Sequence, residues 1–319
     1  MTANVKTMMY VGATPWHGIG KSVDGAITSQ DAIVAAGLDW RVDLEKLFCG
    51  DGEVADKHRA VRRDTDGKIL GVVGKGWQPL QNAEAFAWFD PFVRSGEARY
   101  ETAGALRDGA RVWVLAKIDR PDAVIVPQSD DRVTKYVLLS NGHDGSLAVR
   151  VGFTPIRVVC SNTLAAAHGA TASKLIRLRH TGDVVGALEQ VREVMNVADA
   201  EFEASADQYR ALARREINGK DLETYVKRVF ELGEPGKKAD GQPRQSHTMN
   251  AVLDAFEHGA GNNLPGVAGT WWAAYNAVTD YLTHTRGTDA ATRLDSQWYG
   301  NGATTNARAL QYAFVQATS

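Results

Sequence analysis

Residues 146–182 contain neither aspartate nor glutamate, although the chain as a whole is nearly neutral. It carries 36 Lys and Arg against 38 Asp and Glu, for a net charge of −2. That balance argues against a protein that coats duplex DNA through bulk charge alone. A long acid-free stretch in a neutral chain means that charge is sorted along the sequence, which is the usual footprint of a polyanionic partner.

Long apolar runs and cysteines are also scarce. No run of about 18 apolar residues occurs, so we expect no membrane span. The N-terminal sequence lacks the basic and then apolar pattern of a secretory signal. The two cysteines, Cys49 and Cys160, do not share a metal-ligand spacing. These absences predict a cytoplasmic protein with reduced thiols and with no metal site, cofactor or membrane contact.

The first half of the chain has the composition of β-strands. Residues 110–118, 136–140 and 147–153 are rich in β-branched and aromatic side chains. The turn sequence Asn141–Ser146 between the last two predicts an antiparallel hairpin. Asn82 is a suitable cap for a helix over the residues that follow it, to about position 93. Further along, we expect Pro155 to end a strand, residues 156–160 to continue the sheet, and Ser161 or Asn162 to cap a short helix.

The second half has helical patterning from Gly182 onward. Asp183 is the predicted cap of a long helix to about Arg215, and Gly, Pro and Lys dominate a predicted linker at 233–245. Four further helices are expected at about 221–232, 246–258, 268–285 and 304–317. The predicted fold class is therefore α+β: an antiparallel, hairpin-rich sheet region with packed helices at 1–182, then a helical region at 183–319.

Basic side chains gather in the acid-free stretch. Partial alternation of apolar and basic residues at 174–180 places Arg177 and Arg179 on one face of a strand. The functional interpretation is a cationic track for phosphates; the alternative is a solvated face that acids of the following helix neutralise. The predicted phosphate contacts here are Arg150, Arg157, Lys174, Arg177 and Arg179, and the candidate neutralising acids are Glu189, Glu193, Asp199, Glu201 and Glu203.

A second basic cluster lies at 57–63, and an aromatic residue follows it. Cations for the backbone and ring faces for the bases are what single-stranded nucleic acid requires. Trp77 is the predicted base-stacking ring, whereas Trp88 and Trp113 fit the core of a sheet better. The cations of this cluster that we expect to contact phosphates are Lys57, Arg59, Arg62, Arg63 and Lys75.

Two other motifs have a structural and a chemical interpretation. The polar turn holds Asn141, His143 and Asp144; the last two are an acid/base or metal candidate, although neighbours on a tight turn seldom converge on one point. Cys160 beside His143 or His168 is a conceivable nucleophile and base, but a buried structural cysteine fits better. The helix at 270–282 shows an aromatic face, which core packing or a subunit contact explains.

Several segments together resemble a known family. The stretches 70–86, 140–146 and 153–164, with the motifs near Trp16 and in the aromatic helix, are similar to the phage/plasmid-like family known as domain of unknown function 932. The resemblance implies carriage by phages and plasmids and raises the expectation of DNA metabolism, but it implies no activity and no catalytic residues. Strand-annealing recombinases offer a fold-level analogy, a hairpin-rich sheet beside a basic groove.

The leading hypothesis is thus a DNA-associated protein of a mobile element that binds single-stranded DNA as a homo-oligomer and promotes strand annealing and recombination. One alternative is a non-catalytic structural or protein-interaction protein that uses the aromatic helix. The second is a hydrolase that uses His143 and Asp144. No complete catalytic constellation is visible, so we expect no enzyme.

Overall fold

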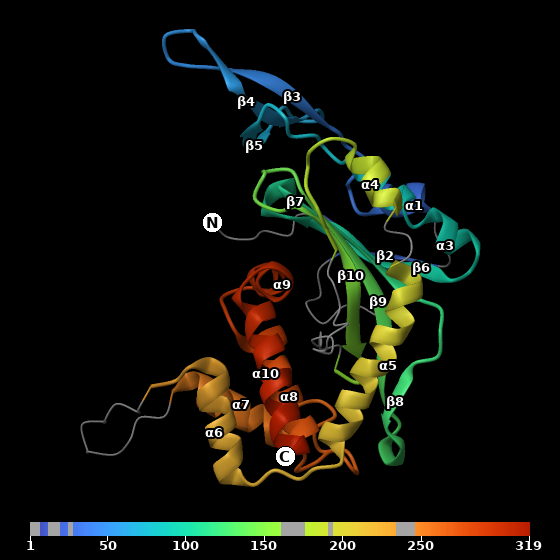
Figure 1. The fold of residues 1–319 in the computed structure, drawn as a ribbon, viewed down its shortest axis with the longest axis vertical. Helices are drawn as coiled ribbons and strands as arrows, with labels where there is room; N and C mark the ends of the chain where they lie inside the picture. The colour runs from blue at the N-terminus through green and yellow to red at the C-terminus, as the bar shows by residue number, and fades with distance from the viewer. Residues whose placement is uncertain (1–6, 12–19, 25–27, 161–175, 191–193, 234–245) are drawn as a thin grey trace. The chain divides into compact units, whose positions relative to one another are not determined.

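The computed structural model describes residues 7–11, 20–24, 28–160, 176–190, 194–233 and 246–319 (Figure 1). The chain forms two compact units. Unit 1 takes residues 1–120, 136–153 and 174–198; unit 2 takes 121–135, 154–173 and 199–319. The boundary between the units falls inside two long strands, β9 (Asp131–Gly142) and β10 (Val149–Arg157), so each unit is discontinuous in sequence. The composition instead predicts a single boundary after position 182.

The larger sheet has the order β11-β10-β9-β7-β6-β1-β2, with β8 paired to β9. The α+β class is confirmed, and β6, β7 and β9 pair antiparallel. Strand β10 continues through Pro155, where the sequence predicted an end. Among the described residues, β11 pairs with residues 149–151 of β10 alone. Pro155 lies beyond this pairing, so its lack of a backbone N–H removes no hydrogen bond to β11. The remaining strands are β1 (Met8–Val11), β2 (Lys21–Val23), β6 (Ala98–Leu106), β7 (Arg111–Ile118), β8 (Ala123–Val126) and β11 (Ile176–Leu178).

A second, three-stranded antiparallel sheet belongs to unit 1. It comprises β3 (Val42–Phe48), β4 (Val54–Arg63) and β5 (Ile69–Gly74). Pairing of β4 with β5 ends at His58 opposite Gly74, while pairing of β4 with β3 continues to Val54 opposite Phe48. The β3–β4 hairpin therefore extends beyond β5, as Figure 1 also shows.

The core of unit 1 lies between the larger sheet and four helices: α1 (Ser29–Ala35), α2 (Asn82–Ala87), α3 (Asp90–Arg94) and α4 (Val184–Gln190). Trp88 and Trp113 are buried, which confirms their core assignment. The Trp88 indole N–H donates to the Leu188 carbonyl at 2.9 Å, which ties α4 to the core. The predicted single helix after Asn82 is instead two short ones, α2 and α3. Gln81 is the N-cap, and the Asn82 amide donates to the Leu38 carbonyl.

Unit 2 is mainly helical (Figure 1). Four of its helices begin after an N-cap residue whose side chain accepts a hydrogen bond from the first turn, a pattern that a sequence can predict. These N-cap residues are Asn218, Ser246, Thr270 and Asp289. Within the predicted long helix at 183–215, the described residues form two helices, α4 and α5. The helix at 290–299 was not predicted. The helices are α5 (Val194–Ala213), α6 (Gly219–Phe230), α7 (His247–His258), α8 (Trp271–Asp280) with a π-helical turn at Tyr281–Thr285, α9 (Ala290–Tyr299) and α10 (Asn301–Thr318).

The aromatic face of α8 is buried. Trp271, Tyr275 and Val278 are at most 5% exposed, and the Tyr209 ring lies 5.1 Å from the Trp272 ring. Core packing explains this pattern, so the helix offers no aromatic partner surface. The predicted linker at 233–245 lies almost wholly outside the described residues.

The contact between β5 and the turn after β9 tests the packing of unit 1. A Cβ at Gly71 would lie 2.5 Å from the Asp144 Cα, whereas at Gly74, on the same strand, nothing lies within 4 Å. We expect Gly71→Ala to lower the free energy of unfolding by about 1–3 kcal/mol, because backbone atoms must move. Gly74→Ala should change it by less than about 0.5 kcal/mol. Equal urea midpoints for the two variants would contradict this packing.

Candidate nucleic-acid interface

Two basic segments that are distant in sequence lie side by side in unit 1. Trp77 forms an antiparallel bridge with Thr181. The Gln78 N–H donates to the His180 carbonyl at 2.8 Å, across 102 positions of sequence. On the other side, the Lys75 N–H donates to the Lys57 carbonyl at 2.9 Å. The strand end after β5 therefore connects the basic part of β4 with the segment that follows β11.

This junction forms the surface that we call the basic track. Its members are exposed, and within the described parts of the chain none of them forms an ion pair. Unpaired cations on one surface are the electrostatic feature that a phosphate chain requires. The basic track comprises Lys57, Lys75, Arg177 and Arg179.

Two pairs of like charges face each other beside the track. Arg150 on β10 lies directly opposite Arg177 on β11, and Arg59 on β4 lies opposite Lys46 on β3. Positive charge is therefore concentrated at two cross-strand positions beside the track. Lys46 was missed in the sequence because it follows two acids and has no basic neighbour. The guanidinium of Arg59 donates to the Asp56 and His58 carbonyls, which fixes its direction.

Two cations of the cluster at 57–63 are already paired. Arg62 lies 3.1 Å from Glu45, and Arg63 lies 2.6 Å from Asp66. The hydrogen bond from Arg63 holds the pKa of the Asp66 carboxyl well below its usual range. Arg63 also donates to the Asp108 carbonyl. These two predicted phosphate contacts are therefore engaged within the fold.

The acidic helix does not neutralise the track where its side chains are described. Glu203 lies 3.8 Å from Arg210, and both belong to unit 2. Asp183 accepts from the Gly186 N–H at 2.8 Å and so caps α4. Four further residues fall outside the described residues or side chains: Asn162, Glu193, Asp199 and Glu201.

Trp77 is not available to a base, which corrects the sequence prediction. It is 9% exposed, and its ring stacks on the His180 ring at 4.7 Å with an interplanar angle of 25°. Burial lowers the pKa of His180, so the neutral ring packs there. Trp77 therefore holds the junction together instead of contacting a ligand. Lys174 lies outside the described residues.

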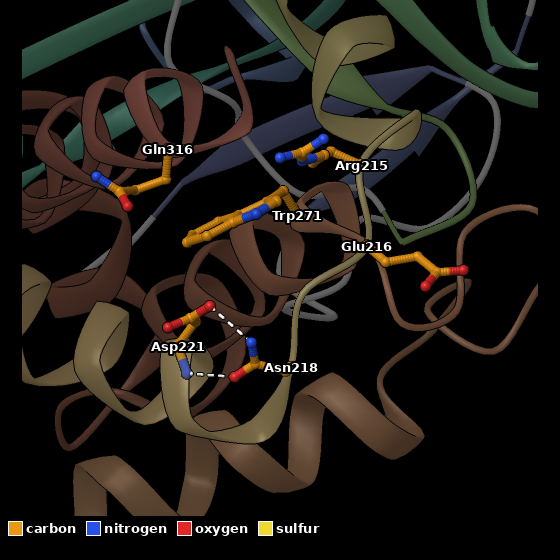
Figure 2. A pocket seen from close by; sticks show the side chains of 6 residues that line it. All are labelled: Arg215, Glu216, Asn218, Asp221, Trp271 and Gln316. Atoms are coloured by element: carbon orange, nitrogen blue, oxygen red, sulfur yellow. Dashed lines mark hydrogen bonds between the residues drawn. The ribbon is translucent and has the colours of Figure 1, made fainter. Parts of the chain in front are cut away.

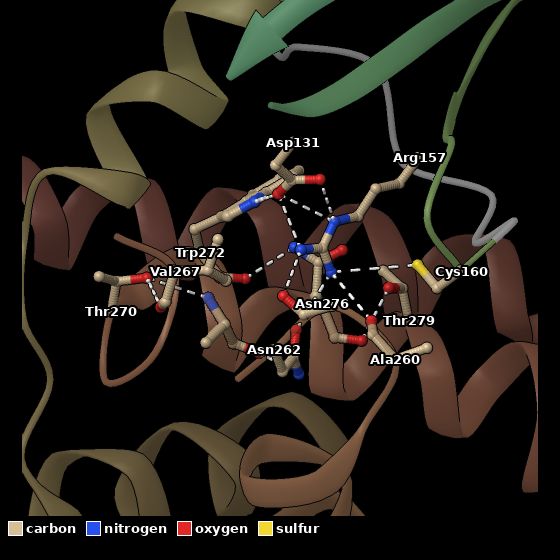
Figure 3. A network of polar contacts seen from close by, with 12 residues as sticks. Asp131, Arg157, Cys160, Ala260, Asn262, Val267, Thr270, Trp272, Asn276 and Thr279 are labelled. Carbon is tan, nitrogen blue, oxygen red and sulfur yellow. Dashed lines mark hydrogen bonds and ion pairs between the residues drawn. The ribbon is translucent and has the colours of Figure 1, made fainter. Parts of the chain in front are cut away.

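Arg157 is also not a phosphate contact, because it is completely buried in unit 2 (Figure 3). Its Nη2 lies 2.7 Å from the Asp131 carboxylate, and its Nη1 donates to Asn262 Oδ1 at 3.1 Å. The Trp272 indole N–H donates to the same Asp131 oxygen at 2.8 Å. Burial of a charge requires such complete pairing, so Arg157 is a structural residue that joins β10 to the helices of unit 2.

The polar turn after β9 does not form an acid/base pair. His143 is fully buried, and its Nε2 lies 2.9 Å from Asn82 Oδ1. The Asn141 amide donates to the Leu80 carbonyl at 2.8 Å. The Asp144 carboxylate instead accepts from the N–H and hydroxyl of Ser146. The turn is thus a structural link between the sheet and α2, and the hydrolase alternative has no paired groups here.

Sequence reasoning missed a titratable pair in unit 2. His284 Nε2 lies 3.9 Å from Asp280 and 3.3 Å from the Cys160 carbonyl. Burial raises the pKa of the Asp280 carboxyl and lowers the pKa of the His284 imidazole. Cys160 is itself buried, and its Sγ lies 4.0 Å from Arg157 Nη1. No sequence signal marked this pair, because its members lie one helical turn apart on a segment that reads as core.

One shallow pocket of about 480 Å³ lies in unit 2 (Figure 2). Asn218 and Asp221 bond to each other and cap α6, and the remaining charges are of both signs. This lining does not favour a polyanion over other polar ligands. The lining residues are Arg215, Glu216, Asn218, Asp221, Trp271 and Gln316.

The described residues offer neither a cluster of metal ligands nor a membrane-spanning helix. They contain no group of three or more His, Cys, Asp or Glu side chains with the geometry to hold a metal ion. No helix among them is both long enough and apolar enough to cross a membrane.

A family model with the description Domain of unknown function (DUF932) matches residues 69–309. This region includes β5, the Trp77 bridge, the polar turn and nearly all the helices of unit 2. Comparison with curated proteins and with solved structures gives no match.

The buried ion pair in unit 2 gives a stability prediction. Arg157→Leu should lower the free energy of unfolding by about 3–5 kcal/mol, because Asp131 loses its partner without access to water. The matched control is Arg132→Ala, which removes the exposed pair with Asp130 beside Asp131 and should leave the denaturant midpoint unchanged. If Arg157→Leu unfolds at the wild-type midpoint, the pair is not a structural centre of unit 2.

The buried histidine predicts a pH dependence of stability. Burial lowers the pKa of His143 to about 3, so below pH 6.5 the unfolded chain binds a proton that the folded chain does not. Stability should therefore fall by about 2 kcal/mol between pH 7 and pH 5. His143→Gln should remove most of that fall and leave the part due to His180, whereas exposed His58→Gln should keep it. Identical pH profiles for the two variants in chemical denaturation would refute the assignment.

Proposed function

The chain belongs to the family described as Domain of unknown function (DUF932), and since that description names no activity, we propose from the surface of unit 1 that the protein binds single-stranded DNA. The observation that carries the proposal is the bridge between Trp77 and Thr181. It joins two cationic segments into the basic track, and the track cations have no ion-pair partner among the described side chains.

The location of the track favours a single strand. It follows β11, a three-residue edge strand, and continues past Lys75 to β4. Four exposed cations are enough to contact one phosphate backbone, whereas duplex binding needs cations spread to meet two. The nearly neutral total charge also fits a local groove better than bulk attraction.

The proposal includes assembly and a role in a mobile element. The resemblance to phage/plasmid-like proteins supports the second part. A homo-oligomer would place several tracks beside one another, so that one strand spans several copies and a complementary strand can be annealed to it. Light scattering with and without oligonucleotide tests this part separately from binding.

A salt titration tests the proposed binding. Each phosphate contact on a single strand contributes about −0.7 to the slope of log K against log salt, so the four track cations predict a slope near −3. The triple variant Lys75→Glu, Arg177→Glu, Arg179→Glu should lower affinity by at least about tenfold and make the slope markedly shallower. Fluorescence anisotropy with a labelled oligothymidylate measures both quantities.

The matched control places the same kind of charge change on unit 2. Lys220→Glu with Lys227→Glu alters two exposed cations of α6 that have no ion-pair partner in the described structure. This variant should bind like wild type. Binding that is absent at low salt, insensitive to salt, or lost equally in both variants would refute the proposed interface.

A further inference from the structure

One aromatic ring stands out on the surface of unit 1. Phe48 is 64% exposed, whereas every other aromatic side chain among the described residues is buried or half-buried. Leaving a phenyl ring in water forfeits the stabilisation that its burial would give. Such an exposed ring is informative when a ligand that needs a ring is expected nearby.

Phe48 is held in a defined place. It ends β3 and lies directly opposite Val54, beyond the reach of β5. The turn that follows is closed by a hydrogen bond from the Cys49 N–H to the Glu53 carbonyl at 2.7 Å. The ring is therefore presented at the end of a paired ladder and not on an unstructured loop.

Three exposed or half-exposed cations lie on the same hairpin as the ring. Lys46 precedes it on β3, and β4 carries Arg59 and Lys57, of which Lys57 belongs to the basic track. None of these three forms an ion pair with another described residue. A ring flanked by unpaired cations matches the composition of a single-strand site, in which the cations contact phosphates and the ring stacks on a base.

We infer that Phe48 stacks on an unpaired base of the bound strand and so extends the interface from the basic track to the end of the β3–β4 hairpin. This inference rests on the proposed single-strand binding. It assigns to Phe48 the role that the sequence assigned to Trp77, which is buried against His180. Because every base has a ring face, the contact adds affinity without sequence preference.

The charge of the turn gives the contact a direction. Asp51 and Glu53 lie in the turn itself, and Asp51 accepts from the Glu53 N–H at 3.1 Å. Phosphates are repelled from these acids, so the backbone of the strand lies away from the turn, toward the cations Lys46, Lys57 and Arg59. Asp51→Asn with Glu53→Gln should therefore tighten binding, and weaker binding would overturn this direction.

Substitutions of Phe48 that keep or remove the aromatic ring test whether stacking, and not apolar volume alone, contributes to binding. Phe48→Ala and Phe48→Leu should both lower affinity for oligothymidylate by about 5- to 150-fold, the range for losing one base stack. Phe48→Tyr should bind within about twofold of wild type. The salt slope should stay the same in all three, because no cation is removed. Val72→Ala, which trims an exposed side chain on β5 of the same sheet, is the matched control.

An oligonucleotide with abasic sites provides an independent readout. Wild type should lose affinity for it to the level of Phe48→Ala, and Phe48→Ala should not distinguish the two oligonucleotides. Cys49 is an exposed thiol beside the ring, while Cys160 is buried. Bound oligothymidylate should therefore slow alkylation of Cys49 in the wild type.

The possible results distinguish a failure of the stacking inference from a failure of the proposed single-strand binding. If wild type shows no salt-dependent binding, the proposed function fails. If wild type binds and Phe48→Ala binds equally well, or if Leu replaces Phe without loss, the stacking inference fails while the basic track stands. If Phe48→Ala changes the oligomeric state in light scattering and leaves binding intact, the ring is a contact between copies and the inference is overturned.

Discussion

The packing of Trp77 against His180 is the contact on which the surface of unit 1 depends. It brings a segment after β5 to a segment after β11, and the backbone bridge beside it fixes their alignment. This contact brings two stretches of modest basicity next to each other. Because His180 is packed as a neutral ring, the junction adds no charge of its own to the basic track.

The basic side chains of this protein fall into two groups with different physical roles. Arg63 and Arg157 are paired with carboxylates in unit 1 and unit 2 respectively, and Arg157 is completely buried. They stabilise the fold. Lys75 and Arg177 are exposed and stay unpaired within the described structure, and Arg177 even faces another arginine across the sheet. Exposed cations without an ion-pair partner are the reason to look for an anionic ligand there.

Sequence patterns were sufficient where local chemistry decides structure. The turn at 141–146 predicted the hairpin of β9 and β10, and Ser246 predicted the start of α7. They were insufficient where a distant partner decides. No residue near Arg157 in the sequence indicates that it forms a buried ion pair with Asp131 on another strand. The same holds for Trp77, whose ring is covered by a histidine 103 positions later in the sequence, His180.

The central claim is that the track around Lys57 and Lys75 is where a single strand lies, and lysine acetylation with and without oligothymidylate tests it most directly. The account predicts that the bound strand slows acetylation of Lys57 and Lys75 severalfold, while Lys220 and Lys227 on α6 react at unchanged rates. Equal rates at all four lysines under conditions where the oligonucleotide is bound, or protection confined to α6, would contradict it.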